Sequence, residues 1–418
     1  MQAIGDGDVA STIADHILAT CCANSPVSMC VADCGVLRPH EFRSQQVSSG
    51  LLLADCAAAR QARPPMSNIR TTFNDLAARG GGTTAPAGSE CPPRLRSVLQ
   101  DLEFLLPGET PPTTPIAASA TTEVTAADLA WGRVVIKRAL AAETEDSAGP
   151  AERAATEAAW LRLMKEIAPG AVPELLGEHR GSPTLVLEWL DPGRAPQWSE
   201  QLASGNAEPT AAAAVGHLYG RMHAATAGRP AFAERFAAER AFRQLAVEPR
   251  FAVAAVAHPD CGDALRAASD AALRLRVALV HGAALPENIL LGPRGPVLVD
   301  GDCARYGDPA FDVATLVASL MLHAVRPGTG RNARPALDAL LATYVQHVTW
   351  EIPTLLVARV AALVPALLLA GIDGRAPVPF IVNRNDANRV RRAARVLLVG
   401  PVPDLETTRA VWFREFQG

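Results

Sequence analysis

The chain has 418 residues, of which 49% are hydrophobic and 20% are charged, so it is long enough to bury a large core in two lobes or domains. Its formal net charge of −4 argues against a nucleic-acid surface or a polybasic membrane surface as its main partner. Six of its eight cysteines lie in the first 91 residues, which excludes the disulfide framework of a small secreted domain.

The first 95 residues differ in character from the rest of the chain. They show no sustained helix or strand period, and residues 78–93 (ARGGGTTAPAGSECPP) combine small residues with turn formers. We therefore predict that residues 1–95 are an N-terminal extension that is partly disordered. A second interpretation is that translation begins at Met66 and that residues 1–65 are a misassigned start.

From residue 96 to residue 190 the pattern predicts a small lobe rich in strands. It begins with a short amphipathic helix, continues through a linker and then alternates strands with one long helix. The predicted elements, in chain order, are a helix at 96–105, a linker at 107–115, a strand at 131–140, a helix at 151–170 and a strand at 182–193.

Residues 191–418 predict a large helical lobe, interrupted by a hairpin at 289–300 whose turn is Gly-Pro-Arg-Gly. The most apolar segment, 355–371, contains Arg359 and Pro365, so we interpret it as a buried helix and not as a membrane span. No basic patch precedes an apolar run at the N-terminus, so we expect a cytoplasmic protein without a membrane partner. The expected fold class is α+β, with two lobes and a cleft between them.

Lys137 and Glu157 are the first candidate site residues. Lys137 follows Val-Val-Ile in an apolar strand, where it either reaches the surface or points into the cleft to hold phosphate oxygens. Glu157 shares the apolar stripe of the predicted helix with Leu161 and Met164. A carboxylate on a packed face needs a partner, so a Lys137–Glu157 ion pair would satisfy both groups.

Asn288 and Asp300 form the second candidate pair. They lie at the two ends of the predicted hairpin, so antiparallel pairing brings them together. An amide oxygen and a carboxylate suit a magnesium ion that also binds phosphates, and Asp302 could add a second carboxylate. The alternative is an asparagine that caps a turn and an aspartate that starts a loop.

These segments together resemble the aminoglycoside phosphotransferase and choline kinase-like family, which has the two-lobed protein-kinase-like fold. The resemblance covers roughly residues 117–418 and rests on ordered motifs: VVIK (134–137), Glu157, LVLEWL (185–190), HGAALPEN (281–288), VLVDGD (297–302) and YGDPAFD (306–312). It implies an ATP-dependent transfer of the γ-phosphate to a hydroxyl of a small molecule, with ATP and Mg²⁺ as cofactors.

The resemblance also implies roles for individual residues. Lys137 would contact the α- and β-phosphates with Glu157 orienting it, and Asn288 and Asp300 would bind magnesium. Asp302 would be a less certain metal or substrate ligand. The remaining roles are backbone contacts to adenine near Glu188 and Leu190, support of the catalytic loop by His281, and anchoring of that loop or capping of the next helix by Asp312.

The sequence departs from the family at the catalytic base. The family's loop reads HGD-x-x-x-x-N, whereas Ala283 stands here where the aspartate would accept the proton of the attacking hydroxyl. Glu287 comes four residues too late to replace it, and Asp302 is a weaker candidate for a substitute base. Three explanations stay open: an engineered substitution, a natural pseudokinase that binds nucleotide and interacts with a protein partner, or an enzyme with an unusual base.

A second departure concerns the turn that would cover the phosphates. It falls near ASATTEV (118–124) and contains no glycine, although Ser119, Thr121 and Thr122 could donate hydroxyl hydrogen bonds. No acidic cluster for a polycationic acceptor stands out in the helical lobe. Five arginines gather between residues 384 and 395, most simply as a solvated helix face; if they faced the cleft, an anionic acceptor would be favoured.

Overall fold

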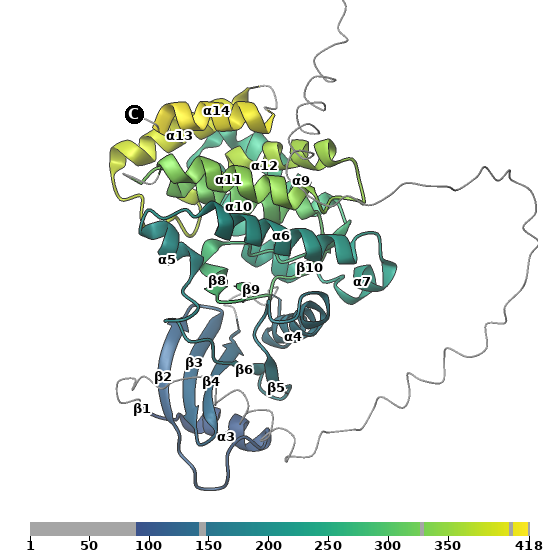
Figure 1. Cartoon of the computed structure of the whole chain (residues 1–418), viewed down its shortest axis with the longest axis vertical. Coiled ribbons are helices and arrows are strands. Elements are labelled where there is room, and N and C mark those ends of the chain that lie inside the picture. The colour runs from purple at the N-terminus through teal and green to yellow at the C-terminus, as the bar shows by residue number, and fades with distance from the viewer. Residues whose placement is uncertain (1–88, 142–147, 327–329, 401–403, 417–418) are drawn as a thin grey trace, which may run out of the picture. The chain divides into compact units, whose positions relative to one another are not determined.

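The computed structural model describes residues 89–141, 148–326, 330–400 and 404–416, all of which belong to one compact unit. Within that unit a six-stranded sheet, the N-lobe, is followed by a mostly helical C-lobe (Figure 1). The predicted two-lobed α+β fold is therefore confirmed. Most of the predicted N-terminal extension, including Met66, lies outside the described residues.

The N-lobe sheet is antiparallel throughout, with the strand order β1-β2-β3-β4-β6-β5. Its strands are β1 (Ser89–Glu90), β2 (Pro112–Ala118), β3 (Thr122–Leu129), β4 (Gly132–Ala139), β5 (Leu175–His179) and β6 (Thr184–Glu188). Helix α3 (Pro93–Asp101) packs Leu95 and Leu99 into a small core with Val134 and Ile136 of β4. Because β1 and the start of α3 precede residue 96, the lobe begins before the predicted boundary.

Part of the predicted linker at 107–115 is a strand. The prolines of this segment argue against a central strand, because proline cannot donate a ladder hydrogen bond. Strand β2 accommodates them at special positions: Pro112 is its first residue, and Pro115 lies where the register with β3 shifts. The two-residue β1 covers only one end of β2, so β2 is close to an edge strand, where proline is tolerated.

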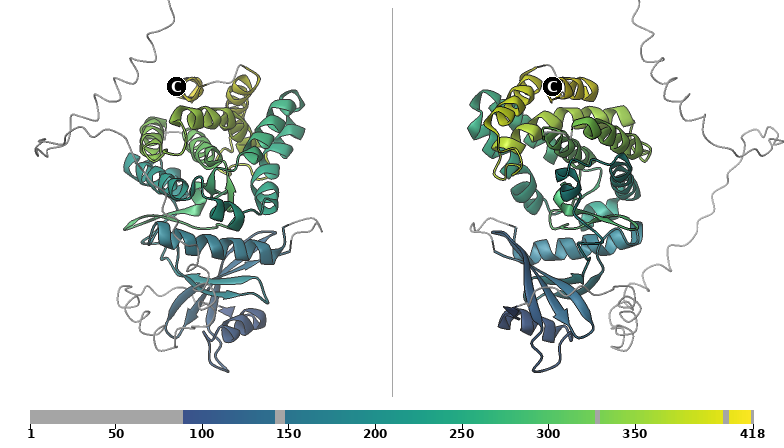
Figure 2. Two further views of the ribbon diagram at one scale, coloured as in Figure 1. Left: turned by 90° about the vertical axis from the view of Figure 1, so that its right-hand side faces the viewer. Right: turned by 60° about the vertical axis from the view of Figure 1, so that its left-hand side comes forward.

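Helix α4 (Pro150–Ile167) connects the two lobes. Pro150 occupies its first turn, where a missing backbone N–H is tolerated, and the chain turns away at Pro169 and Gly170. The helix contacts β4, β5 and β6 on one side and α6 on the other. Both views of Figure 2 show it between the sheet and the helices of the C-lobe. It thereby carries Glu157, and the residue one turn earlier, to the junction of the lobes.

The C-lobe contains the predicted hairpin within a bundle of helices. Strands β8 and β9 pair antiparallel from Ile289↔Leu298 to Gly292↔Gly295, as predicted, and β7 pairs with β10. The elements are α5 (Trp198–Ala203), α6 (Pro209–Thr226), α7 (Pro230–Arg235), a π-helix (Phe242–Val247), α8 (Glu248–Ala257), α9 (Gly262–Arg274), β7 (Ala278–Val280), β8 (Ile289–Gly292), β9 (Gly295–Leu298), β10 (Arg305–Gly307), α10 (Pro309–His323), α11 (Gly330–Val345), α12 (Pro353–Asp373), α13 (Arg384–Val399) and α14 (Leu405–Phe416).

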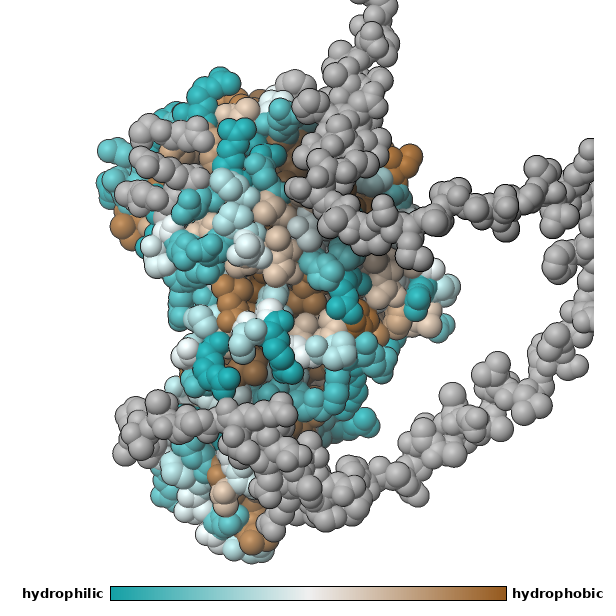
Figure 3. All heavy atoms as spheres, viewed as in Figure 1, coloured by the Kyte–Doolittle hydropathy of each residue, from teal (hydrophilic) through white to brown (hydrophobic). Residues whose placement is uncertain are grey.

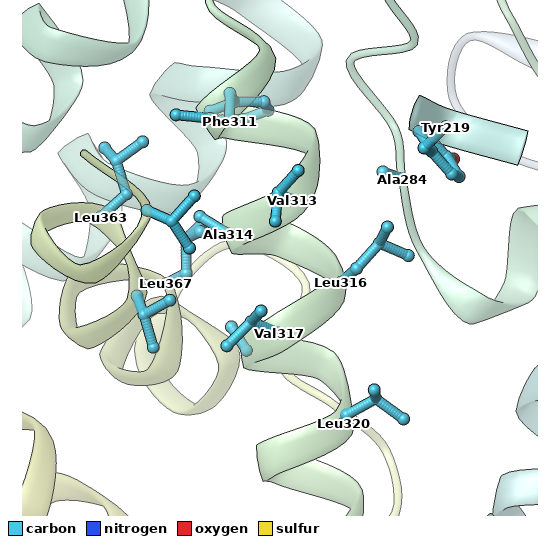
Figure 4. Close-up of a cluster of buried hydrophobic side chains, with 14 of the residues drawn as sticks. Tyr219, Ala284, Phe311, Val313, Ala314, Leu316, Val317, Leu320, Leu363 and Leu367 are labelled. Carbon is cyan, nitrogen blue, oxygen red and sulfur yellow. The ribbon is translucent and has the colours of Figure 1, made fainter. Parts of the chain in front are cut away.

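Helix α10 is the centre of the C-lobe core, and every one of its 15 residues is buried. Figure 4 shows it between Leu363 and Leu367 of α12 on one side and Tyr219 and Ala284 on the other. Its N-cap is Asp308, whose carboxylate accepts a hydrogen bond from the Ala310 N–H at 3.0 Å. A helix buried on all sides has little freedom to shift, so its N-terminus is a rigid support.

The apolar segment 355–371 forms most of α12, which is long and apolar enough to span a membrane and, in the part of the chain described, is alone in this. It packs against α8, α10 and α13, and 61% of its most apolar stretch is buried inside the protein. The predicted buried helix is confirmed. Arg359, which interrupts the segment, pairs with Asp308 and Glu351. On the face in Figure 3, hydrophilic residues are spread over both lobes, with apolar residues in smaller groups between them.

Close packing of α6 on α11 predicts that Gly216→Ala destabilises the protein. A Cβ at Gly216 would lie 2.3 Å from the backbone carbonyl oxygen of Leu340, which cannot rotate away. We expect a loss of about 1–3 kcal/mol in the free energy of unfolding, despite the higher helix propensity of alanine. Urea denaturation measures it, with Gly149→Ala as the control because a Cβ there has no neighbour within 4 Å. Equal stability of the two variants would contradict the expected contact.

Candidate active site

Lys137 is the centre of the candidate site. It lies on β4, which is held between β3 and β6, and its side chain is only 10% exposed. Its ammonium donates to Glu157 Oε2 of α4 at 2.6 Å and to Asp300 Oδ1, just after β9, at 2.5 Å. The predicted Lys137–Glu157 pair is thus formed, and the same ammonium reaches Asp300 as well.

The charges of this group depend on one another. Burial alone would lower the pKa of Lys137, but Asp300, Glu157 and Asp302 together raise it well above its usual value. Lys137 in turn holds the pKa of Asp300 below its usual range. Burial raises the pKa of Glu157 to about 7, because the attraction of Lys137 does not fully offset the loss of water and the two nearby aspartates. At neutral pH Lys137 and Asp300 are therefore both charged.

Asn288 and Asp300 meet as the hairpin geometry predicted. The Asn288 amide nitrogen lies 3.5 Å from Asp300 Oδ2 and donates to the Ala283 carbonyl oxygen at 3.1 Å. Neither contact uses the Asn288 amide oxygen. Asp300 has a φ of +68°, in the left-handed region, and its side chain remains 41% exposed. Aspartate is one of the few residues that adopt this conformation readily, and here the carboxylate that it carries stays partly exposed beside Asn288.

This donor set fits a magnesium ion. An amide oxygen and a carboxylate are hard ligands, and Mg²⁺ usually takes one or two protein ligands and completes its shell with phosphate oxygens and water. Among the described residues no group of three or more histidine, cysteine or acidic side chains could hold a metal by itself. An ion at Asn288 and Asp300 would therefore depend on phosphates for the rest of its shell.

The loop at 281–288 is held by Asp312, on the first turn of α10. The Asp312 carboxylate accepts hydrogen bonds from the backbone N–H groups of His281 at 2.7 Å and Gly282 at 2.9 Å. Gly282 has a φ of +79°, and a Cβ there would lie 2.8 Å from the Cys303 carbonyl oxygen, so only glycine fits. Asp312 thus anchors the loop, whereas Asp308 caps the helix.

His281 ties this loop to the end of the hairpin. Its Nδ1 accepts from the Ala283 N–H at 3.3 Å, which leaves Nε2 protonated to donate to the Val299 carbonyl oxygen at 3.1 Å. Burial lowers the pKa of His281, so the ring is neutral. The indole of Trp160 on α4 packs against the ring, with centroids 5.0 Å apart. His281 therefore connects the loop that contains Ala283 to Val299, the residue before Asp300.

Ala283 leaves the loop intact without a carboxylate. Its carbonyl oxygen accepts from the Leu285 N–H at 2.8 Å and from the Asn288 amide at 3.1 Å. Glu287, four residues later, has an exposed side chain. The hydrogen bonds that shape the loop come from its backbone and from the side chains of His281, Asn288 and Asp312, and none of them needs a carboxylate at position 283.

Asp302 faces a residue that sequence reasoning missed. Arg153, one turn before Glu157 on α4 and only 1% exposed, places Nη1 3.3 Å from Asp302 Oδ2. Its Nη2 donates to the carbonyl oxygens of Thr121 at 3.0 Å and Leu140 at 2.5 Å. The signal in the sequence was an arginine four residues before Glu157, on the same face of the predicted helix.

The turn expected to cover phosphates and the expected adenine contacts lie at the ends of N-lobe strands. Ser119, between β2 and β3, accepts at its hydroxyl oxygen from the N–H groups of Thr121 at 3.2 Å and Thr122 at 3.0 Å. Its hydroxyl also lies 3.4 Å from the Thr121 hydroxyl. Glu188 ends β6, and its N–H already donates to the Glu174 carbonyl oxygen at 2.9 Å. An adenine contact from the Glu188 N–H is therefore disfavoured. Leu190 follows in the connector between the lobes.

Arginines on α13 are paired with acids of the C-lobe. The pairs with partners on other elements are Arg389 and Arg392 with Glu415, Arg391 with Asp373, and Arg395 with Asp260. This arrangement matches the predicted solvated helix face. It gives no reason to expect an anionic acceptor.

The chain belongs to a phosphotransferase enzyme family, whose model matches residues 114–351. The motifs quoted for the resemblance fall within that range. A comparison with curated protein sequences finds no significant match.

Solved structures of small-molecule kinases are similar at low sequence identity. A choline/ethanolamine kinase family protein from Mesorhizobium loti is 16% identical, with a TM-score of 0.40, over 77% of this chain and 99% of that one. An ethanolamine kinase from Plasmodium vivax is 12% identical, with a TM-score of 0.46, over 78% and 95%. An amicoumacin kinase in complex with AMP-PNP, Ca²⁺ and Ami is 15% identical, with a TM-score of 0.43, over 78% and 96%.

We expect removal of the Lys137 ammonium, which pairs with both Glu157 and Asp300, to lower the stability of the protein in a pH-dependent way. Lys137→Met leaves the buried Glu157 without its partner, and we expect the free energy of unfolding to fall by about 3–5 kcal/mol at pH 8. The loss should be smaller at pH 6, because the pKa of Glu157, already raised to about 7, rises further without Lys137 and the carboxyl takes up a proton. Urea denaturation at the two pH values measures both effects.

The control for this variant is Arg138→Met, on the next residue of β4, which removes a more exposed pair with Glu123. Its loss should stay below about 1 kcal/mol and change little between the two pH values. Equal losses for the two variants would show that Lys137 has no special electrostatic role.

Proposed function

We propose that the chain binds ATP with Mg²⁺ at the junction of its lobes and that its scaffold serves transfer of the γ-phosphate to a hydroxyl of a small molecule. The observation that carries this proposal is the group Lys137, Glu157 and Asp300, with Asn288 3.5 Å from Asp300. Phosphoryl transfer is catalysed mainly by positioning and by neutralisation of charge. A buried lysine close to two oxygen ligands suited to magnesium, those of Asn288 and Asp300, can supply both.

Each residue then has a defined task. Lys137 would exchange its contact with Asp300 for the α- and β-phosphates while Glu157 keeps it oriented. Asn288 and Asp300 would hold the magnesium ion, which neutralises charge on the phosphates when bound. Ser119 would donate its hydroxyl to a phosphate oxygen, and the backbone near Leu190 would receive adenine. His281 and Asp312 act through the loop that they support.

Ala283 separates nucleotide binding from transfer. A methyl group cannot accept the proton of an attacking hydroxyl, and general-base catalysis contributes on the order of 10²–10⁴ in rate. The magnesium and lysine contacts do not involve this side chain. We therefore infer that the chain binds Mg-ATP but transfers phosphate slowly. The acceptors that fit the family are amino alcohols, sugars and hydroxyl-bearing natural products, in the cytoplasm where ATP is available.

Ala283 also supports a second function. A loop that keeps its hydrogen bonds without a carboxylate would suit a pseudokinase, in which bound nucleotide stabilises one conformation for a protein partner. The two functions share the nucleotide site and differ in what a restored carboxylate would do.

Calorimetric titration of ATP, with and without magnesium, tests the nucleotide site. We expect the affinity for ATP to increase with Mg²⁺ and to fall at least tenfold in Asp300→Asn. The neutral amide cannot balance the charge of the ion and cannot form an ion pair with Lys137. Arg138→Met is the matched control and should bind as the original chain does. A helical scaffold without a nucleotide site would show no magnesium dependence and no effect of Asp300→Asn.

Restoration of the base distinguishes the two functions. We expect Ala283→Asp to raise acceptor-dependent phosphate transfer by about 10²–10⁴ for at least one member of a panel of amino alcohols, sugars and aminoglycosides. The matched control is Ala283→Asn, which has nearly the same shape and cannot act as a base. Magnesium-dependent ATP binding without transfer by Ala283→Asp would favour the pseudokinase.

A further inference from the structure

We propose that Arg153 is a built-in cation at Asp302, so that nucleotide is bound with one divalent ion, at Asn288 and Asp300, and not with two. Arg153 is a positioning residue in this view and does not touch the substrate. The ion count rests on the proposed nucleotide binding, whereas the blocking of Asp302 by Arg153 does not.

The geometry of Arg153 shows a fixed charge. Its guanidinium is 1% exposed and is held by the carbonyl oxygens of Thr121 and Leu140 in addition to Asp302. Three partners from separate segments leave it no freedom to swing away. A buried guanidinium needs a carboxylate partner, and Asp302 is the acid that it meets.

Asp302 is correspondingly unsuited to a metal. Its side chain is 11% exposed, against 41% for Asp300 two residues earlier. The Nη1 of Arg153 lies 3.3 Å from its Oδ2, so this carboxylate oxygen already has a cationic partner. A divalent ion at Asp302 would therefore have to approach a buried positive charge in a medium of low dielectric constant.

The charge balance leads to the same conclusion. Glu157, Asp300 and Asp302 face two basic side chains, Lys137 and Arg153. With both cations in place, a single negative charge remains when all three acids are ionised, so the protein attracts one divalent ion only weakly before nucleotide arrives. Loss of Arg153 would leave Asp302 and its neighbours with a stronger attraction for metal.

Arg153 also links this charge to the turn above it. Its hydrogen bond to the Thr121 carbonyl oxygen holds the turn between β2 and β3, which carries Ser119. The turn between β2 and β3, which contains no glycine, is thus held in place by a side chain of α4. The same side chain that occupies Asp302 therefore positions the donors proposed to reach the phosphates.

The first test counts bound Mn²⁺ by electron paramagnetic resonance at saturating AMP-PNP. We expect about one ion per chain in the original protein and about two in Arg153→Gln, because the released Asp302 can accept a second ion. Arg153→Lys, which keeps the charge, should hold about one, and Arg153→Gln with Asp302→Asn should return to about one. Two ions in the original chain, or no gain in a folded Arg153→Gln, would overturn the proposal.

The second test needs no nucleotide. We expect millimolar MnCl₂ to raise the melting temperature of Arg153→Gln and to leave that of the original chain nearly unchanged. Arg305→Gln is the matched control, because Arg305 is equally buried and pairs with Glu239 away from this group. If the original chain binds no nucleotide, the proposed function fails, and this measurement alone decides the role of Arg153.

A third variant covers the case in which Arg153→Gln does not fold. Asp302→Asn removes the candidate ligand while its amide oxygen can still accept from Arg153. Under the proposal its Mn²⁺ count with AMP-PNP, or its Mn²⁺-dependent melting shift without nucleotide, equals that of the original chain. A lower count or a smaller shift would identify Asp302 as a metal ligand and refute the role of Arg153.

Discussion

One buried ammonium connects the parts of this protein that phosphate chemistry needs. Lys137 on the central part of the sheet donates to Glu157 on α4 and to Asp300 after the hairpin, so three segments meet at one charge. Burial of that charge is unfavourable unless carboxylates compensate it. The two acids are therefore held close to the lysine, and their position in turn orients α4 and the hairpin end against the sheet. The junction of the lobes depends on this balance.

The catalytic loop depends on a different support. Helix α10 is buried along its whole length, and the Asp312 carboxylate on its first turn accepts two backbone N–H groups of the loop. Neither bond involves the side chain at position 283. The loop can therefore keep these hydrogen bonds with an alanine at position 283. This alanine also separates two questions that a complete site would join, namely whether the protein binds nucleotide and whether it transfers phosphate.

Patterns of local period were sufficient for many elements. Strand β4, helix α4 and the hairpin of β8 and β9 were predicted because each has an apolar repeat with turn residues at its ends. The hairpin also placed Asn288 beside Asp300, since antiparallel pairing determines which residues are opposite. The linker at 107–115 was wrong in part. Its prolines predicted a linker without a strand. In the structure Pro115 lies at the register shift with β3, and the short strand β1 pairs with only one end of β2, features that the order of residues does not reveal.

Residue types and their spacing along the chain were enough to predict the fold class, the family and the Lys137–Glu157 pair. Which charged groups are paired became clear only from the packing of the lobes. Lys137 pairs with Asp300, and Arg153 pairs with Asp302. Asp312 holds the loop, whereas Asp308 caps helix α10. An ion pair forms between groups that packing brings within a few ångströms of each other. The hydrophobic period of a segment predicts that it is a helix or a strand, but it does not determine how α4 packs between the lobes.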